Sequence, residues 1–577
     1  MIDKNQRYFY YFALFMILKR YFLIGITFIL LSTANSFSFN KNNNKKIYSS
    51  KYITNYLYGS ILYDDFQHNL AVNNLRKNFK LQGQHSDYDV KYVTSLIIDG
   101  RFDEAEQYIS SLNKSYTDVF IFNFLKSIFY LQKKEYEKAL KQIRKVKSQD
   151  RLFIELKNTL VFWIELEQNH KTKNTLVKNF KSKNSPGITL INKFLASKYI
   201  GDVELYKLYN LKILYSDSYV RYKVLSAWNL SNEGERNQAL KILKLALMIN
   251  SQNVLLKQSF KNFKLENYNI ASFFNSKKIN HNLSEIFYLF SNLYQQRNDF
   301  LFSNLLLSIS LEFNKAFLSN NMIKFENKLT YNSKHNFNYL FLSKLRGIGD
   351  EYLWHVNYNL LRYTKNQQIN NLVSLINTND FFVEKKYMDL GNYYRVKKDY
   401  KSALVYYDKV EKINSDQDWS FYYFKGICYE RLKQWKDSEK NLKKSISLSP
   451  KKYTVINYLA YSWLERRENI DEATKMLEEA VELSKWELGY IIDSLGWAYF
   501  LKEEYGKAEK ILKIAYEKTP YESEVYDHYG DALWKQKKYL QARYVWKNAL
   551  NLENIELKRK KSIQQKILNG PKFSEKN

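Results

Sequence analysis

The sequence predicts an all-α fold, an α-solenoid of stacked helical hairpins, and two observations support this prediction. Between positions 384 and 554, small residues return at intervals of 34 to 36: Gly391, Gly426, Ala460, Gly496 and Gly530. A second small residue follows each of them 12 or 13 positions later: Ala403, Ser438, Ala473, Ala508 and Ala542. This period corresponds to one hairpin per repeat, and small residues at both positions let two antiparallel helices cross closely. The composition agrees, because 45% hydrophobic residues with only 4 Pro and 16 Gly among 577 describe an ordered, helix-rich chain.

The N-terminal segment has the pattern of a secretion signal. An apolar run at 21–31 precedes small residues at 34–36 and follows four cations: Lys4, Arg7, Lys19 and Arg20. The run is too short to span a bilayer, and a longer helix would place Lys19 and Arg20 inside the hydrocarbon. We interpret residues 1–36 as a cleaved signal peptide, with an uncleaved signal anchor as the alternative. Either way, we expect an exported protein of the periplasm or cell envelope.

Hairpins are also expected between the signal and the C-terminal repeats. Residues 37–51 form a linker, and residues 52–180 repeat the pattern, because Ala71, Ala105 and Ala139 follow one another at intervals of 34. Residues 181–383 are expected to be degenerate helical repeats that stack less regularly. One clear hairpin there is marked by Ala227, Ala239 and Ala246, and a weaker one by Ser291, Tyr294, Ser303 and Leu307. Residues 384–554 form the C-terminal array, and residues 555–577 are expected to be a basic capping helix and tail.

One unit of the C-terminal array closely resembles the tetratricopeptide repeat (TPR). Seven residues fall on the positions of that repeat: Leu495, Gly496, Tyr499, Ala508, Leu512, Ala515 and Pro520. The resemblance implies a right-handed TPR superhelix that is irregular in its middle. The last hundred residues also look like exported bacterial repeat proteins, some of which are adaptors for carboxyl-terminal processing proteases. That similarity lies in the stretches 457–461, 492–498 and 531–534.

The charge distribution argues against a nucleic-acid partner, although the formal net charge is +31. Residues 453–553 contain 14 Lys plus Arg and 18 Asp plus Glu, a balance of −4, so the rest of the chain carries +35. Composition drift in an AT-rich coding sequence is one explanation of this excess. Attraction to an anionic membrane or cell-wall surface is the functional alternative.

No catalytic, cofactor or metal site is predicted, so we expect a protein that is not an enzyme. Gly347-Ile348-Gly349 lacks the preceding strand and the third glycine of a dinucleotide-binding loop. His528 lies near two aspartates, but a metal there would need ligands from another helix, and we expect a solvated or partner-facing polar cluster. The single cysteine, Cys428, is expected to be a small packed residue. An unrecognised site in the irregular middle is the remaining enzymatic alternative.

The resemblance to TPR proteins also implies a binding surface, because ligands of that family usually lie in the concave groove lined by the first helix of each hairpin. The groove-facing candidates are Asn392, Arg395, Tyr423, Asn457, Tyr461, Asp493, Trp497, Asp527, Asp531 and Trp534. The aromatic rings would bury apolar side chains of a polypeptide, and the carboxylates would pair with its Lys or Arg; alternatively, the rings only pack between repeats. The sequence therefore predicts a scaffold or adaptor for a protein partner, such as an envelope protease or assembly factor. The alternative is a structural tether that binds anionic envelope polymer or lipid through its basic repeats.

Overall fold

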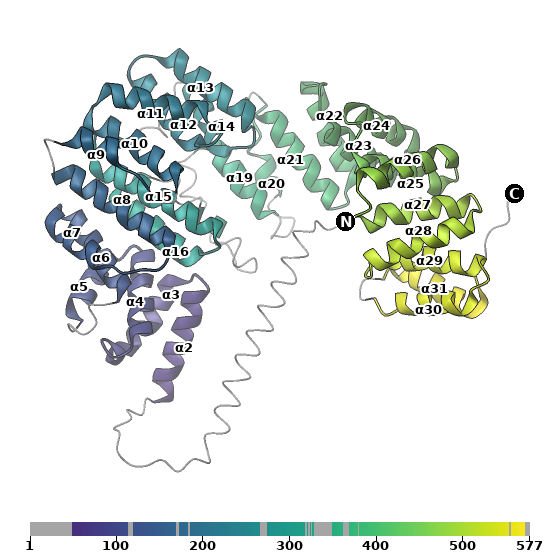
Figure 1. Cartoon of the computed structure of the whole chain (residues 1–577), viewed down its shortest axis with the longest axis horizontal. Helices are drawn as coiled ribbons and strands as arrows, with labels where there is room; N and C mark the ends of the chain where they lie inside the picture. The colour runs from purple at the N-terminus through teal and green to yellow at the C-terminus, as the bar shows by residue number, and fades with distance from the viewer. Residues whose placement is uncertain are drawn as a thin grey trace, which may run out of the picture. The chain divides into compact units, whose positions relative to one another are not determined.

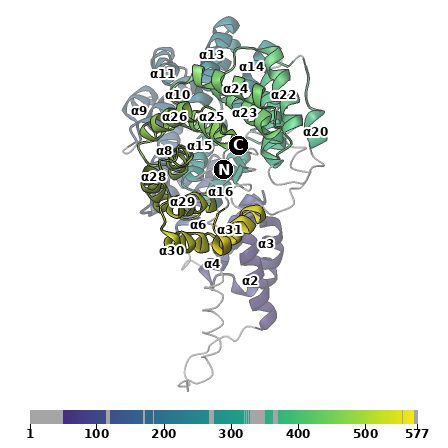
Figure 2. The same cartoon turned by 90° about the vertical axis from the view of Figure 1, so that its right-hand side faces the viewer.

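Every regular element in the described part of the chain is a helix (Figures 1 and 2). The computed structural model describes residues 49–571 except 113–118, 169–171, 183–184, 266–273, 362–368, 379, 553–554 and all but five positions of 318–348. The predicted signal segment and nearly all of the linker lie outside the described residues. None of the described helices combines the length and apolar character needed to cross a membrane. The helices pair as antiparallel hairpins, which confirms the predicted all-α solenoid. The chain divides into one unit that ends at Lys147 and a second that begins at Ser148.

The first unit consists of three hairpins, α2/α3, α4/α5 and α6/α7. Ala71, Ala105 and Ala139 are fully buried at their crossings, as the 34-residue interval predicts. At the first crossing, a β-carbon on Gly59 would lie 2.8 Å from the side chain of Leu75, so only glycine allows this approach. The helices are α2 (Ser50–Asp64), α3 (His68–Leu75), α4 (Ser86–Ile98), α5 (Phe102–Ser111), α6 (Phe120–Gln132) and α7 (Tyr136–Lys145), with a 3-10 segment, η2 (Arg76–Leu81), after α3.

The second unit begins with the middle part of the chain, whose hairpins include α10/α11, α12/α13 and α15/α16. The two middle hairpins marked by small residues in the sequence are confirmed as α12/α13 and α15/α16. The helices are α8 (Arg151–Gln168), α9 (Lys173–Asn179), α10 (Pro186–Ile200), α11 (Val203–Tyr215), α12 (Val220–Asn232), α13 (Arg236–Ile249), α14 (Val254–Lys264), α15 (Ile279–Gln296), α16 (Phe300–Phe313), α19 (Asp350–Leu360) and α20 (Ile369–Val373).

The α15/α16 hairpin does not contact only its neighbours in sequence, because α15 also packs against α8, much earlier in the chain. The hydroxyl of Tyr294 donates to Asp150, which directly precedes α8, at 2.6 Å. At α12, the guanidinium of Arg221 forms a two-point ion pair with Glu285, whose side chain is completely buried. The rings of Tyr288 and Phe317 lie against the same guanidinium, 4.5 and 4.4 Å away. Charge attraction, hydrogen bonds and ring contacts together stabilise this buried pair. All three are needed because the removal of two charges from water is unfavourable.

Helix α14 packs against α19 in place of the helix that follows it. The contact is close, since a β-carbon on Gly349 would lie 2.2 Å from the amide carbon of Gln258. Gly349 has φ +129°, a backbone conformation that favours glycine, and Gln258 accepts a hydrogen bond from the backbone N–H of Glu351 at 2.8 Å. The α14/α19 contact joins two helices of the middle part, and the indole N–H of Trp354 on α19 donates to Asp389 on α21 at 3.0 Å, which connects α19 to the C-terminal array.

Five hairpins form the C-terminal array, α21/α22 to α29/α30, and they follow one another in chain order (Figure 1). The five small residues of the first helices and the five of the second helices are all buried, which confirms the pattern in the sequence. Ser438, one of the second set, also donates its hydroxyl to the carbonyl of Gly426 at 2.9 Å. The helices are α21 (Val383–Val396), α22 (Tyr400–Ile413), α23 (Trp419–Arg431), α24 (Trp435–Leu448), α25 (Tyr453–Arg466), α26 (Ile470–Leu483), α27 (Gly489–Leu501), α28 (Tyr505–Lys518), α29 (Ser523–Lys535), α30 (Tyr539–Ala549) and the capping helix α31 (Leu557–Asn569).

Candidate binding surface of the C-terminal array

The ten predicted groove residues all lie on the first helices of the five hairpins, α21, α23, α25, α27 and α29. The structure brings them together in two groups, one at each end of the array. Six of them are half-buried: Asn392, Arg395, Tyr423, Tyr461, Trp497 and Trp534. Four are buried: Asn457, Asp493, Asp527 and Asp531. At the C-terminal end, ion pairs and hydrogen bonds join most of the polar groups, although Oδ1 of Asp531 has no hydrogen-bond partner among the described residues.

At the C-terminal end of the array, a buried polar cluster surrounds His528. The imidazole Nδ1 of His528 lies 3.0 Å from a carboxylate oxygen of Asp493, and the indole of Trp497 stacks on the imidazole with 4.2 Å between ring centres. In the neighbouring repeat, the hydroxyl of Tyr461 donates to Glu524 at 3.1 Å. The cluster is therefore bonded within the chain. Of the two expectations for His528, a solvated or a partner-facing cluster, the solvated one is wrong because this side chain is only 6% exposed.

The charge state of His528 follows from its neighbours. Burial alone would lower the pKa of this imidazole, but Asp493, and to a smaller extent Glu524 and Asp527, outweigh burial and raise the pKa to about 9. His528 is consequently an imidazolium at neutral pH, and it supplies the counter-charge of the buried carboxylate of Asp493. This arrangement fits a structural role within the repeats.

The capping helix α31 occupies the carboxylates that the sequence analysis assigned to a partner. The ammonium of Lys566 lies 2.6 Å from Asp527 and 2.7 Å from Asp531. Arg559, one turn into the same helix, pairs with Glu524 at 2.9 Å. The pKa of Asp531 is raised by burial, and the ammonium of Lys566 limits that rise. Asp527 and Asp531 thus pair with a cation of the same chain, where the sequence suggests the Lys or Arg of a partner.

At the N-terminal end of the array, polar atoms on the first helices are left without partners. The Nε–H of Arg395 and the amide oxygen of Asn457 are buried and have no hydrogen-bond partner among the described residues. The guanidinium of Arg395 lies 4.0 Å above the ring of Phe424, and the ring of Tyr423 packs edge-on against Tyr458. This end of the array therefore leaves one donor and one acceptor buried and unpaired among aromatic rings.

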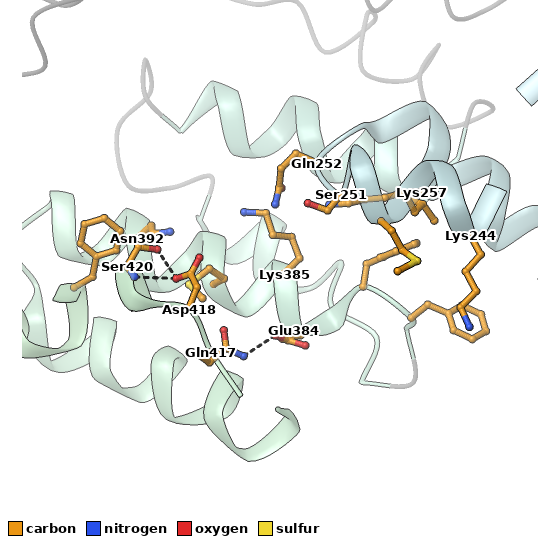
Figure 3. Close-up of a pocket in the computed structure, with 16 residues that line it drawn as sticks. Lys244, Ser251, Gln252, Lys257, Glu384, Lys385, Asn392, Gln417, Asp418 and Ser420 are labelled. Carbon is orange, nitrogen blue, oxygen red and sulfur yellow. Dashed lines mark hydrogen bonds between the residues drawn. The ribbon is translucent and has the colours of Figure 1, made fainter. Parts of the chain in front are cut away.

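A cavity of about 590 Å³ opens beside this group (Figure 3). One wall comes from α13, α14 and the turn between them, and the other from α21 and the start of α23. Figure 3 shows Gln252 and Lys385 reaching into the space between the two walls. Asn392 also lines the cavity, and its amide oxygen accepts a hydrogen bond from Tyr407 at 2.9 Å. Its volume falls within the range of ligand pockets in proteins.

Several residues of the two groups were missed by the sequence analysis. The spacing of Arg559, Ile563 and Lys566 places all three on one face of α31, and this signal could have indicated a helix that docks on acidic residues. Lys257 and Phe381, which line the cavity, carry no comparable signal. They lie over a hundred residues apart in sequence and come to the same cavity only through the tertiary packing of α14 near the start of α21.

Cys428 is buried, which confirms the expectation of a small packed residue, and burial raises the pKa of its thiol to about 12. Within the described residues, no three His, Cys, Asp or Glu side chains are placed to hold a metal ion.

No protein-family model matches the sequence, and no curated protein matches it. Solved structures resemble part of it. MamA (residues 41 to the end) from Desulfovibrio magneticus RS-1 shares 19% identity, over 30% of this chain and 94% of MamA, with a TM-score of 0.27. The TPR protein TTC0263 from Thermus thermophilus shares 19% identity, over 32% of this chain and 99% of TTC0263, with a TM-score of 0.28. By its paired helices and the register of its small residues, the chain is an all-α solenoid of tetratricopeptide type.

Proposed function

We propose that the protein is a non-enzymatic scaffold that binds a segment of a partner protein along helices α21 to α25 of its C-terminal array. The observation that carries this proposal is the open cavity beside α21, next to an unpartnered buried donor on Arg395, whose guanidinium lies over the lining residue Phe424. On α25, the amide oxygen of Asn457 is also buried without a partner among the described residues. A buried donor or acceptor without a partner costs about 1–3 kcal/mol, and the backbone of a bound polypeptide has both C=O and N–H groups to satisfy them.

The array is suited to this task because its binding atoms are held by rigid helices. Aromatic rings such as Tyr423 have few rotatable bonds, so they can bury the partner's apolar side chains at a low entropic cost. The C-terminal end of the array is already covered by α31, so the partner segment is expected to lie toward α21. We further propose that the scaffold acts in the cell envelope, on the basis of the signal-like residues 1–36, with an envelope protease or assembly factor as the partner.

In-cell photocrosslinking tests the proposal. A photoreactive residue at Asn392, which lines the cavity, is compared with one at Val405, which is 54% exposed on the second helix of the same hairpin. We expect a dominant protein adduct from position 392 only, and a weaker one after Arg395→Ala. Equal adducts from both positions, or adducts with lipid and polymer only, would contradict the scaffold.

A second candidate function is attachment to an anionic surface, and the outer face of α11 favours it. Val203, Leu211 and Tyr215 are exposed on this helix, Tyr215 by 87%, beside Lys207 and Lys212. Apolar side chains next to cations are typical of surfaces that bind anionic membranes. Co-sedimentation with phosphatidylglycerol vesicles should be lost after Tyr215→Ser and Leu211→Ser together. Unchanged binding, or binding to neutral vesicles as well, would remove this candidate.

A further inference from the structure

The cavity is held in shape by contacts between its two walls. The ring of Phe260, on α14, packs edge-on against Phe381 and Phe382 with 6.2 and 6.5 Å between ring centres. One turn along α14 from Lys257, the ammonium of Lys261 lies 3.1 Å from Asp380, which precedes α21. Such contacts fix the position of α14 relative to α21, so the cavity is a built feature of this unit.

One cation that lines the cavity has no counter-charge. Lys257 is only 7% exposed, and no carboxylate in the described part of the chain lies within ion-pair distance of its ammonium. The nearest aromatic ring is that of Phe382, 5.6 Å away. Burying an ammonium without a paired charge is unfavourable, so this site is incomplete without an anion.

The carboxylates around Lys257 are already engaged by other cations. Asp389 pairs with Lys385 at 2.6 Å, and Glu351 pairs with Lys386 at 3.0 Å. Burial lowers the pKa of Lys257, Lys385 and Lys386 lower it further, and Asp389 and Glu351 oppose them. The carboxylates around Lys257 therefore do not balance the positive charge of its ammonium.

The two acidic residues that line the cavity are likewise engaged. The carboxylate of Asp418 caps the N-terminus of α23 by accepting from the backbone N–H groups of Ser420 and Phe421, at 2.9 and 3.1 Å. Glu384 accepts from the side-chain amide of Gln417 at 2.7 Å (Figure 3). Neither carboxylate is oriented by a contact with Lys257, so among the described residues no acidic side chain of the lining supplies its counter-charge.

The remaining lining indicates what accompanies that anion. Met248, Phe381, Met388 and Phe424 give the cavity an apolar surface, to which the amides of Gln252 and Asn392 add hydrogen-bonding groups. A small inorganic anion would leave this apolar surface in contact with water. A carboxylate next to an aromatic or aliphatic side chain satisfies both parts of the lining.

We propose that the cavity binds an acidic residue of the partner polypeptide together with the apolar side chain next to it, with Lys257 as the ion-pair partner. This inference rests on the proposed scaffold function and specifies the chemistry of the segment that enters the array first. Lys385 and Gln252, which reach into the cavity, hold the segment's backbone.

The test uses the full-length protein and two synthetic peptides. Acetyl-Gly-Phe-Glu-Leu-Gly-amide and its Gln counterpart differ only in the charge at the central residue. We expect the Glu peptide to bind about tenfold more tightly, which corresponds to about 1.4 kcal/mol, and Lys257→Met to abolish that preference. Lys241→Met is the matched control, because Lys241 is exposed on α13 and does not line the cavity.

A second readout does not depend on the peptides. Because an unpaired buried ammonium destabilises the fold, Lys257→Met should raise the local free energy of unfolding of α14 measured by hydrogen exchange, whereas Lys241→Met should not change it. Equal binding of both peptides, or weaker protection of the α14 amides in Lys257→Met, would overturn this inference. If the adduct at position 392 persists in that case, the scaffold function stands and only the acidic specificity is wrong. If the protein with Lys257 intact gives no adduct from position 392 and binds neither peptide, both proposals are wrong.

Discussion

The close crossing of α27 and α28 allows the packing of the repeat to be tested by adding one methyl group. A β-carbon on Gly496 would lie 2.5 and 2.7 Å from two side-chain carbons of Leu512 and 3.2 Å from its backbone nitrogen. Carbon atoms in favourable contact are about 3.5–4.0 Å apart, so α28 would have to move outward. Overpacking of this kind costs about 1–3 kcal/mol, which exceeds the roughly 0.5–1 kcal/mol that alanine gains over glycine within a helix.

Gly506 on α28 is the matched control for Gly496→Ala. A β-carbon there would meet only the side chain of Gln536, at an ordinary 3.7 Å. Gly506→Ala should therefore stabilise its hairpin by about 0.5 kcal/mol, while Gly496→Ala destabilises it by about 1–2 kcal/mol. A chain of 577 residues in two units will not unfold in one step, so local free energies from hydrogen exchange in α27 and α28 are the appropriate measurement. If Gly496→Ala protects these amides as well as Gly506→Ala does, small residues do not set the crossing distance.

Three further predictions concern ionisable groups. Since the pKa of His528 is raised to about 9, protonated His528 stabilises the fold by on the order of 3 kcal/mol below about pH 6.5, and this contribution is lost by about pH 9. The local free energy of unfolding of α29, measured by hydrogen exchange, should therefore fall over this pH range, and the fall should be absent in His528→Gln. Lys566→Met removes the ion-pair partner of Asp531 and the nearer of the two cations at Asp527, and it should expose α29 to α31 to limited proteolysis. Lys561→Met, on the exposed face of α31, should not. Cys428 should resist iodoacetamide in the native protein and react fully in urea; rapid native labelling would contradict its burial.

Most of the C-terminal array could be predicted from the sequence because its contacts are local. A small residue such as Gly426 and its counterpart Ser438 belong to one hairpin, so their spacing alone specifies the crossing. Pro450 and Pro520 follow the ends of α24 and α28, where a helix cannot continue through proline.

The contacts that were not predicted join residues far apart in sequence. Glu285 reaches Arg221 across 64 positions, and no periodicity in the sequence connects them. The same limit applies to the binding surface. The sequence placed Asp531 on a helix face correctly, but the helix that covers this face, through Lys566, is determined by how α31 packs on the last hairpin.

The return of α15 and α16 has a consequence for how this solenoid comes apart. Repeats that touch only their neighbours can open one at a time from a free end. Here the guanidinium of Arg297 donates to Asp150, 147 positions earlier in the chain, at 3.0 Å. Arg221, which lies between these two residues in sequence, forms an ion pair with Glu285. Helices α8 to α16 are therefore closed into a ring of contacts that must open as one cooperative block. Pulling on the C-terminus should peel the α21 to α31 hairpins off individually before that block yields in a single step.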